Sequence, residues 1–390
     1  MNVLIVVQRY GDEVVGGSEQ HARLVATRLA RRHHVEIATT NAVDYWTWAP
    51  HYPAGNDFLD SIMVRRFAVT AGRDPEFKAF EHHVLEEDHD IADELAWPDR
   101  QGPVCPGLLE FLHAHGQEYD VVLFYTYIYA PTALGLPLVP ERAALISTAH
   151  DEYPLRLAPY RALFHLPRAI GYLTPEERAM VHRRFHNEQV SDVVIGYALD
   201  VAPAADVPAF RARHDLRGPY VLYLGQVTEG KGVDELLSEW DRMRERGQGT
   251  DLTLVLAGTV RMTIPERPDV RALGRISETD KAAALADAQV LVQPSRLESL
   301  GIVLFEAWQY GTPVLVHAAN SVTAGQTERS GGGRAYADGA FAEALADLRA
   351  ERDAAGDRGR TFVARECSFD ALDARLEALL DATVGGAGGA

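Results

Sequence analysis

The sequence predicts an α/β protein made of two halves, each a mostly parallel sheet covered by helices. Short apolar runs typical of buried strands recur through both halves, and helical stretches of mixed polarity separate them. The pattern is interrupted between Gly196 and Gly218, where prolines and small residues indicate a linker. A chain of 390 residues, 47% of them hydrophobic, is long enough for two or three domains with their own cores.

The first half is expected to open with a strand at residues 3–7, a glycine-containing loop and an amphipathic helix over residues 20–31. Further strands are expected at residues 35–39, 62–67, 121–125 and 144–149. Between residues 73 and 116 the sequence is acidic and irregular and contains histidines. This composition indicates an insertion that holds helices.

The second half repeats the alternation, with strands expected at residues 220–224, 252–256, 290–292 and 314–316. Helices are expected over residues 233–240 and 278–288, and a last helix over 369–380. The glycine- and alanine-rich tail at 385–390 is expected to be frayed. The predicted domains are therefore residues 1–196 and 197–365, followed by a final helix and flexible tail at 366–390.

The segment from Ala288 to Val316 predicts a strand, a loop, a short helix and a second strand, with Gly311 at the helix end. Glu298 lies in the loop and Glu306 in the helix, on either side of the helix start at Gly301. In an open α/β sheet, ligands bind outside the carboxyl ends of the strands, where a helix N-terminus offers free amide groups. Two carboxylates there suit a ligand with hydroxyls and an anionic part, such as a sugar nucleotide.

The pair Glu298-x7-Glu306, with Gly301 between them and Gly-Thr-Pro-Val after them, resembles the signature of family-4-type retaining glycosyltransferases of the GT-B group. The resemblance implies two Rossmann-like domains facing a central cleft, with a C-terminal helix that crosses back to the first domain. It implies that Glu298 faces the donor sugar near its reacting centre and that Glu306 holds the ribose hydroxyls. One solvated loop glutamate and one helix-capping glutamate are the competing interpretation.

The glycine-rich segment from Gly225 to Gly232 follows a strand and comes within one residue of a Walker A loop. A Walker A loop needs Ser or Thr after its lysine, and Gly232 stands there, which disfavours a nucleoside triphosphatase. The Gly-x5-Lys-Gly spacing is similar to the diphosphate loop of the glycosyltransferases, which implies that Lys231 contacts the diphosphate. Only Lys78, Lys231 and Lys281 are lysines, so a lysine here indicates a compact charge for a phosphate. An ordinary surface lysine, as assumed for the other two, is the alternative.

Gln226 departs from the resemblance, because that family usually has arginine directly after the loop glycine. Glutamine donates hydrogen bonds but carries no charge. Lys231 and Arg275 could then hold the diphosphate, or turnover is slow, or the donor chemistry differs. The segment Gly274-Arg275-Ile276 resembles the loop whose backbone contacts the nucleobase. Because backbone contacts leave no side-chain signature, the sequence does not identify the base. The expected donor-binding residues are Gly17, Gln226, Lys231, Arg275, Ile276, Leu300, Gly301, Ile302 and Glu306.

The segment Gly16-Gly17-Ser18-Glu19 resembles the glycine-rich acceptor loop that opens the first helix of this family. Gly17 could let the backbone approach the diphosphate, and Ser18 is either an acceptor contact or a helix N-cap. No G-x-G-x-x-G follows the first strand, which disfavours a dinucleotide oxidoreductase.

His150 matches in position a histidine that the family places under the donor sugar, so it joins Glu298 and Lys231 as a predicted catalytic residue. A buried histidine with structural hydrogen bonds is the alternative. Asp151 and Tyr127 are expected on the acceptor side, with Tyr127 stacking on a sugar ring. Alternation along a strand explains the tyrosines around residue 127 equally well.

Composition excludes several classes of protein. A net charge of −18 and a pI near 5.3 disfavour binding to nucleic acid or anionic lipid. Cys105 and Cys367 are too few and too distant for a disulfide framework, so a reducing cytoplasm is expected. The first residues lack the pattern of a signal peptide, and no apolar run reaches transmembrane length.

No metal or cofactor is expected beyond the nucleotide sugar itself, because the resemblance implies a diphosphate held without metal and the spacing of the candidate ligands fits no metal site. These candidates are His82, His83, Asp88 and His89. The predicted function is retaining transfer of a sugar from a nucleoside-diphosphate sugar to a hydroxyl of a soluble or carrier-linked acceptor. A nucleotide-sugar epimerase and a non-catalytic nucleotide-sugar-binding protein on the same fold remain alternatives.

Overall fold

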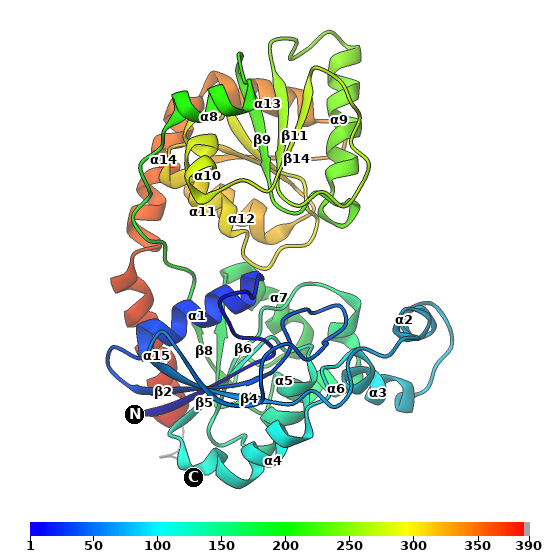
Figure 1. Ribbon diagram of the computed structural model, residues 1–390, viewed down its shortest axis with the longest axis vertical. Coiled ribbons are helices and arrows are strands. Elements are labelled where there is room, and N and C mark those ends of the chain that lie inside the picture. The colour runs from blue at the N-terminus through cyan, green and yellow to red at the C-terminus, as the bar shows by residue number, and fades with distance from the viewer. Residues whose placement is uncertain (386–390) are drawn as a thin grey trace. The chain divides into compact units, whose positions relative to one another are not determined.

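The computed structural model describes residues 1–385, and the chain divides into two compact units (Figure 1). We call Met1–Gly196 together with the chain from Leu372 onward the N-terminal unit, and Tyr197–Ala371 the C-terminal unit. Each unit has its own sheet, and a buried core of aliphatic and aromatic side chains packs against each. The predicted fold class, two α/β units with mostly parallel sheets, is confirmed.

The described part of the N-terminal unit has an eight-stranded sheet in the order β3-β4-β2-β1-β5-β6-β7-β8. The strands are β1 (Asn2–Val7), β2 (His34–Thr40), β3 (Gly55–Leu59), β4 (Ile62–Phe67), β5 (Val121–Tyr125), β6 (Ala143–Ile146), β7 (Ala169–Tyr172) and β8 (Ser191–Val194). Strand β3 pairs antiparallel with β4, and the other pairs are parallel. The carboxyl ends of β1, β2 and β4 to β8 therefore meet at one edge, where ligands bind in open sheets.

Helices cover this sheet on both faces, which is why central strands such as β5 are buried along their whole length. They are α1 (Gly17–Leu29), α2 (Phe77–Glu86), α3 (Ile91–Gln101), α4 (Pro106–His115), α5 (Ala130–Gly135), α6 (Ala158–Leu163), α7 (Pro175–Phe185) and α15 (Phe369–Gly385). Short 3-10 turns lie at Gly116–Glu118, Leu136–Leu138 and Tyr153–Arg156. Helices α2 to α4 form the predicted insertion, and Figure 1 shows α2 standing away from the sheet.

The last helix, α15, returns to the N-terminal unit as predicted. Arg28 of α1 forms an ion pair with Asp373 at 2.5 Å, and His33 lies 3.1 Å from Glu377. The apolar face of α15 is buried at Leu372, Leu376, Leu379 and Leu380. The helix is described to Gly385, and the tail that we expected to be frayed lies, from residue 386 on, outside the described residues.

His21 connects α1 to Gly196, where the first segment of the N-terminal unit ends. It is completely buried, with Nε2 2.9 Å from the carbonyl of Gly196 and Nδ1 3.1 Å from the Tyr125 hydroxyl. These partners fit a neutral ring that donates from Nε2 and accepts at Nδ1. Burial lowers the pKa of His21 to about 4.

This lowered pKa predicts a loss of stability in mild acid. The unfolded chain binds a proton near pH 6.5, whereas folded His21 resists it until about pH 4. The stability that neutral His21 provides is thus present above pH 6.5 and lost as the pH falls toward 4, by about 3 kcal/mol. In urea unfolding between pH 4 and 8, the free energy of unfolding of His21→Gln should change less with pH than that of the parent protein. The control is His113→Gln, which changes an exposed histidine and should keep the pH dependence of the parent protein. The same pH dependence in both variants would contradict the role of His21.

The described C-terminal unit has a six-stranded, entirely parallel sheet in the order β11-β10-β9-β12-β13-β14. Its strands are β9 (Tyr220–Leu224), β10 (Thr253–Ala257), β11 (Val270–Gly274), β12 (Val290–Gln293), β13 (Val314–His317) and β14 (Gly333–Tyr336). Its helices are α8 (Val207–His214), α9 (Val233–Glu245), α10 (Glu278–Asp287), α11 (Ile302–Gln309), α12 (Ser321–Ser330), α13 (Phe341–Ala350) and α14 (Arg352–Glu366), with a 3-10 turn at Glu229–Lys231.

Several strands were not predicted, and their sequences explain why. Strand β3 is exposed along nearly its whole length, and β11 and β14 are largely exposed, so their residues lack the apolar pattern of buried strands. Strand β7 includes Gly171 within its four residues, and β8 begins with Ser191 and Asp192, so neither shows the apolar run of the predicted four-residue strands β12 and β13. No helix among the described residues is both long and apolar enough to cross a membrane.

Candidate active site

The loop between β12 and α11 brings the first predicted glutamate to the amino end of a helix. Strand β12 is buried, and α11 begins at Ile302 after Gly301 takes a left-handed conformation with φ of 67°. A side chain at Gly301 would also meet the Thr323 methyl at 3.0 Å, so glycine suits this turn. The amide groups of the first helical turn have no acceptor within the helix, which leaves them available to an anion.

Lys231 and Glu298 meet at this edge of the sheet. The Lys231 ammonium donates to Glu298 Oε1 at 2.7 Å. The Lys231 side chain is 38% exposed and that of Glu298 is 17% exposed, so a ligand can reach the ammonium. Because an ammonium has three N–H donors, Lys231 can bond to Glu298 and to a phosphate oxygen at once.

Gly232, which stands where a Walker A loop has Ser or Thr, is required by packing. Its φ is 73°, and a Cβ there would lie 2.8 Å from the carbonyl oxygen of Pro294. This close approach of two loops is what sets Lys231 beside Glu298. A hydroxyl side chain for a magnesium ion cannot be accommodated without moving one of the loops.

Gly232→Ser is therefore expected to destabilise the protein rather than to create a magnesium site. The left-handed backbone and the contact with Pro294 together predict a loss of about 1–3 kcal/mol in the free energy of unfolding. Thermal unfolding measures this loss. The matched control is Gly230→Ser in the same loop, where a Cβ would meet nothing within 4 Å. Equal stability of the two variants would show that the packing at Gly232 does not matter.

Three glycines hold the loops after β9, β10 and β11 together. The amide of Gly258 donates to the carbonyl of Gly274 at 2.8 Å, and a Cβ on Gly258 would overlap the carbonyl oxygen of Gly225. Sequence reasoning singled out Gly225 and Gly274 and missed Gly258. Its position directly after an apolar strand was the available signal.

Glu306 is also paired with a lysine. Lys281 Nζ lies 3.0 Å from Glu306 Oε1 and forms an ion pair with Glu278 at 2.6 Å. Burial alone would lower the pKa of Lys281, but the Glu306 and Glu278 carboxylates raise it above its ordinary value. The assumption that Lys281 is an ordinary surface lysine was wrong, because its side chain is only 26% exposed and is ion-paired. Two of the three lysines therefore each hold one glutamate of the motif.

The remaining donor-side residues lie on the same unit. The side chains of Gln226 and Arg275 are exposed, and the structure gives them no hydrogen bond or ion pair among the described residues. The carbonyl of Gln226 accepts from the Tyr223 hydroxyl at 2.6 Å, which fixes the backbone of the loop. Ile276 is partly buried, and Leu300 is packed in the core, so Leu300 can reach a ligand only through its backbone.

On the N-terminal unit, a buried carboxylate that the sequence analysis missed fixes the segment before His150. Glu177 is 1% exposed, and Oε1 accepts from the Ser147 hydroxyl at 2.6 Å and from the Ala149 amide at 2.7 Å. Its Oε2 accepts from the Leu173 amide at 2.6 Å. Burial raises the pKa of Glu177 above its ordinary value. The available signal was the Thr-x-x-Glu capping pattern that ends at Glu177.

His150 is half-buried and has a carboxylate neighbour. Its Nδ1 lies 3.5 Å from Glu152 Oε1, the same oxygen that accepts from the Tyr127 hydroxyl at 2.8 Å. Burial alone would raise the pKa of Glu152, but the neighbouring His150 imidazole and the hydrogen bond from Tyr127 bring it below its ordinary value. Glu152 can therefore orient the imidazole by its Nδ1 side, and it was not predicted.

The sugar-stacking role expected of Tyr127 is wrong. The ring is 0% exposed and packs edge-on against Tyr160 at 5.1 Å, so it offers no free face. Tyr125 is likewise completely buried. Strand alternation, the competing interpretation, does not explain its direction either, because β5 ends at Tyr125 and is buried along its whole length. Tyr127 reaches the site only through its hydrogen bond to Glu152.

The N-cap alternative for Ser18 is also wrong. Helix α1 begins at Gly17 with Gly16 as its N-cap, and the Ser18 hydroxyl donates to Glu19 Oε2 at 2.9 Å. Gly17 is exposed, and a Cβ there would meet nothing within 4 Å, so space remains beside its backbone. Glu19 forms a buried ion pair with Arg9 at 2.6 Å, which fixes the start of the helix.

Asp151 is 64% exposed and pairs with Arg184 at 3.2 Å, so it is available to a ligand at the carboxyl edge of the N-terminal sheet. The predicted residues therefore fall into two sets. Glu298, Lys231, Glu306 and their neighbouring loops gather on the C-terminal unit, and Gly17, Ser18, His150 and Asp151 lie on the N-terminal unit.

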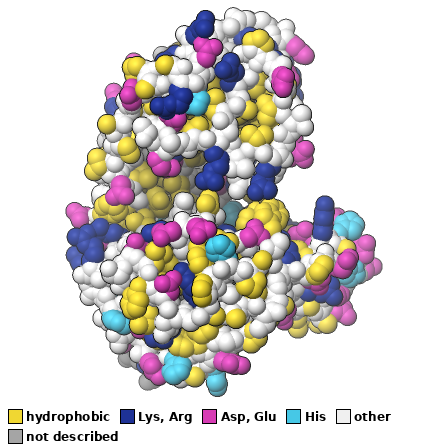
Figure 2. All heavy atoms as spheres, viewed as in Figure 1, with side chains coloured by type: hydrophobic (Ala, Val, Ile, Leu, Met, Phe, Trp, Pro, Cys, Tyr) yellow, Lys and Arg dark blue, Asp and Glu magenta, His cyan; other side chains and the backbone are white. Residues whose placement is uncertain are grey.

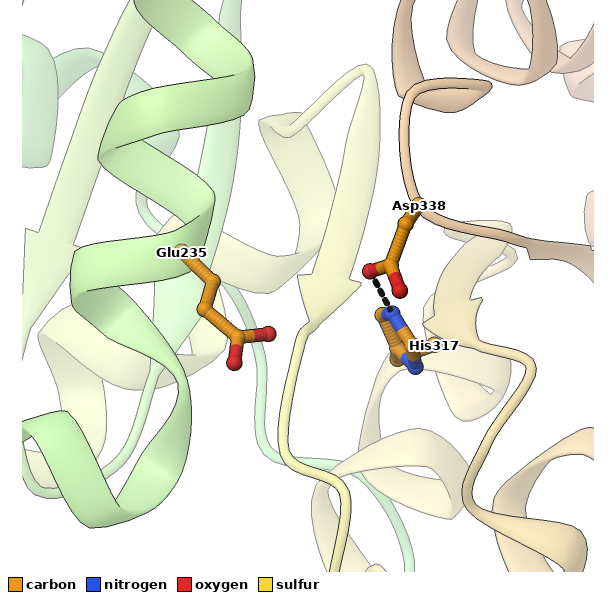
Figure 3. A group of neighbouring side chains, drawn as sticks. All are labelled: Glu235, His317 and Asp338. Atoms are coloured by element: carbon orange, nitrogen blue, oxygen red, sulfur yellow. Dashed lines mark hydrogen bonds and ion pairs between the residues drawn. The ribbon is translucent and has the colours of Figure 1, made fainter.

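Among the described residues, one group could bring three ligand atoms close enough for a metal ion: Glu235, His317 and Asp338 (Figure 3). An arginine already occupies this position, because Arg296 forms ion pairs with Glu235 at 3.0 Å and with Asp338 at 2.7 Å. His317 Nδ1 accepts from the Ala319 amide, so its proton sits on Nε2, which donates to Asp338 at 3.0 Å. The group instead anchors the loop that carries Glu298.

Comparison with known proteins gives relatives for most of the chain. Residues 218–351 match the family described as Glycosyl transferases group 1. The chain is 25% identical over 340 residues to glycogen synthase from Mycobacterium tuberculosis, covering 81% of this chain and 77% of that protein. It is 28% identical over 240 residues to alpha-D-kanosaminyltransferase from Streptomyces kanamyceticus, covering 54% and 60%.

Solved structures share the fold. Sucrose-phosphate synthase from Thermosynechococcus elongatus matches with a TM-score of 0.71 at 18% identity, covering 97% of this chain and 98% of that one. The Anabaena protein HepE in complex with UDP and glucose matches with a TM-score of 0.67 at 12% identity, covering 98% and 99%. At these identities the likeness concerns the arrangement of the chain.

Proposed function

We propose that this chain, a family-4-type retaining glycosyltransferase of the GT-B group, binds its nucleoside-diphosphate sugar at the carboxyl edge of the C-terminal sheet. The sugar is transferred to a hydroxyl of a soluble or carrier-linked acceptor held by the N-terminal unit. The observation that supports this best is the placement of Glu298 just before α11, where it accepts a hydrogen bond from Lys231 of the glycine-rich loop after β9.

The main task of the C-terminal unit is to stabilise the leaving group. When the bond from the sugar to the diphosphate breaks, negative charge grows on the phosphate oxygens. The Lys231 ammonium and the free amides at Gly301 and Ile302 supply positive charge and donors that need no rearrangement. Lys231 thereby meets part of the charge that the family's usual arginine would meet at Gln226, and Arg275, in the loop after β11, is the candidate for the rest.

The glutamates position the donor. Glu306 accepts from the ribose hydroxyls, and Lys281 holds its carboxylate in place. Glu298 lies near the reacting carbon and stabilises the positive charge that develops on the sugar ring as the diphosphate departs. His150 donates a hydrogen bond to a hydroxyl of the sugar, with Glu152 fixing the ring from the Nδ1 side. We assign no covalent nucleophile.

A thermal-shift panel tests the proposal. UDP, GDP, ADP, dTDP and NAD are added separately, each with magnesium and with a chelator. A ligand at about 100 times its Kd adds roughly 2.7 kcal/mol, which moves the midpoint of a 200-residue unit by about 5–10 °C. We expect one nucleoside diphosphate to give a shift that the chelator leaves unchanged. Stabilisation by NAD alone, or by no nucleotide, would contradict the proposal.

A further inference from the structure

The loop after β2 exposes a tryptophan on an otherwise well-anchored backbone. Trp46 is 53% exposed, whereas Trp48, two residues later, is completely buried and donates from Nε1 to the Gln101 carbonyl at 2.8 Å. Trp48 is therefore a core residue, whereas the packing of the core does not account for Trp46. The Trp46 ring packs against the ring of Tyr45, with ring centres 4.6 Å apart and planes at 33°, so only part of the indole is open to a ligand. A single exposed aromatic ring is common on protein surfaces, and it points to a binding surface only together with its neighbours.

Hydrogen bonds from three directions fix the loop that carries Trp46. Asp44 accepts from the amide and the hydroxyl of Thr47 at 2.8 and 2.7 Å. Arg9 donates to the carbonyl of Val43 at 2.8 Å, and Arg73 donates to the carbonyl of Tyr45 at 3.2 Å. The exposed indole is thus held in one place rather than carried on a loose loop, which lowers the entropy cost of binding a ligand.

Arg73 adds positive charge beside the indole. Its guanidinium lies 5.9 Å from the ring centre of Trp46 and 5.1 Å from that of Phe77. Among the described residues it forms no ion pair with a carboxylate, and its Nε is buried without a hydrogen-bond partner. Acidic side chains are spread over the visible face of each unit (Figure 2), and the net charge is −18. An arginine without an acidic partner is therefore suited to an anionic group from outside.

Both residues lie where the sheet presents ligand-binding loops. Trp46 follows β2 and Arg73 follows β4, and these two strands are parallel neighbours in the N-terminal sheet. Their loops therefore leave the sheet at the same carboxyl edge as the glycine-rich loop at Gly16 and Gly17 after β1. Neither Trp46 nor Arg73 is among the residues assigned to the donor.

We propose that Trp46 and Arg73 form an acceptor platform for a sugar or cyclitol ring that carries an anionic substituent, a phosphate or a carboxylate. The apolar C–H face of the ring stacks on the indole, and the anionic substituent pairs with the guanidinium. The inference rests on the proposed function, because it names the acceptor class of that transferase. It also gives an acidic protein the local positive charge that an anionic acceptor requires.

The test is direct binding, measured by calorimetry at millimolar concentrations of glucose 6-phosphate, glucuronate, myo-inositol 1-phosphate and neutral glucose. We expect at least one anionic ring to bind more tightly than glucose. Trp46→Ala should weaken that binding about tenfold or more, and Trp46→Phe should retain most of it. Arg73→Met should abolish the preference over glucose, and Arg73→Lys should retain part of it.

Matched controls are Phe58→Ala, which removes an exposed aromatic side chain from β3, and Arg31→Met, which removes an exposed arginine. Both should bind as the parent protein does. Binding of no anionic ring, equal binding of glucose, or unchanged binding by Trp46→Ala would overturn the platform. The thermal shift with nucleoside diphosphate is measured on the same variants. A normal shift with failed acceptor binding contradicts this inference alone, whereas no nucleotide shift in any protein contradicts the proposed function.

Discussion

Lys231→Ala is expected to reduce turnover by about 10²-fold or more while leaving the fold intact. Lys231 places an ammonium beside Glu298. This positive charge stabilises the diphosphate most strongly as the bond to the sugar breaks, so its loss affects the transition state more than the bound donor. The loss should therefore appear mainly in kcat, with a smaller change in KM. Release of nucleoside diphosphate from the donor sugar, with and without acceptor, measures this under single-turnover conditions.

Two comparisons separate a catalytic effect from a general loss of charge. Lys78→Ala removes an exposed lysine from α2 and should leave turnover unchanged. Lys231→Arg keeps the charge but replaces a compact ammonium with a planar fork, so partial activity is expected. Turnover by Lys231→Ala at the parent rate would remove Lys231 from the mechanism. A large rise in KM with an unchanged kcat would limit its role to binding.

Glu177→Ala is expected to lower the free energy of unfolding by about 3 kcal/mol or more. Removal of the carboxylate leaves the Ser147 hydroxyl and the amides of Ala149 and Leu173 buried without their acceptor. For a unit of about 200 residues, this corresponds to a fall of roughly 6–12 °C in Tm. Since Ala149 precedes His150, we also expect a lower kcat below the unfolding temperature.

The control for Glu177 is Glu188→Ala, which removes an exposed carboxylate a few residues beyond the same helix. Its Tm should stay within about 1 °C of the parent value. Glu177→Gln is a second probe, because the amide oxygen can still accept hydrogen bonds while its NH2 group faces donors. Intermediate stability of Glu177→Gln would support the hydrogen-bond explanation. A Tm for Glu177→Ala equal to that of Glu188→Ala would refute it.

The sequence predicts features that depend only on neighbouring residues in the chain. The strand, loop and helix around Glu298 could be predicted because buried strands, a left-handed glycine and helical spacing are local properties. The place of Lys231 in a glycine-rich loop after a strand could be predicted from the same local pattern, whereas its contact with Glu298 could not. Residues whose role depends on a partner far away in the sequence could not. Examples are Lys281, which pairs with Glu306, and Arg296, which joins Glu235 to Asp338.

The errors have the same origin. The pattern around Tyr127 allowed a ligand-facing or a core-facing ring, and only the packing of Tyr160 decides that it faces the core. The same limit applies to Trp46 and Trp48, about which the sequence predicts nothing, because no period in a loop tells an exposed side chain from a buried one. Side-chain direction outside regular elements follows from tertiary contacts that a single sequence does not display.

Helix α15 has a consequence for anyone who would exchange the two units between relatives. It begins at Phe369 in the C-terminal unit, and from Leu372 it supplies leucines to the core of the N-terminal unit. A gene fragment that stops at Gly196 therefore encodes an incomplete domain with an open apolar face. The transplantable module is discontinuous: residues 1–196 together with the last helix. A hybrid enzyme should accordingly receive a foreign donor unit as an insertion between these two segments rather than as a replacement of the C-terminal half.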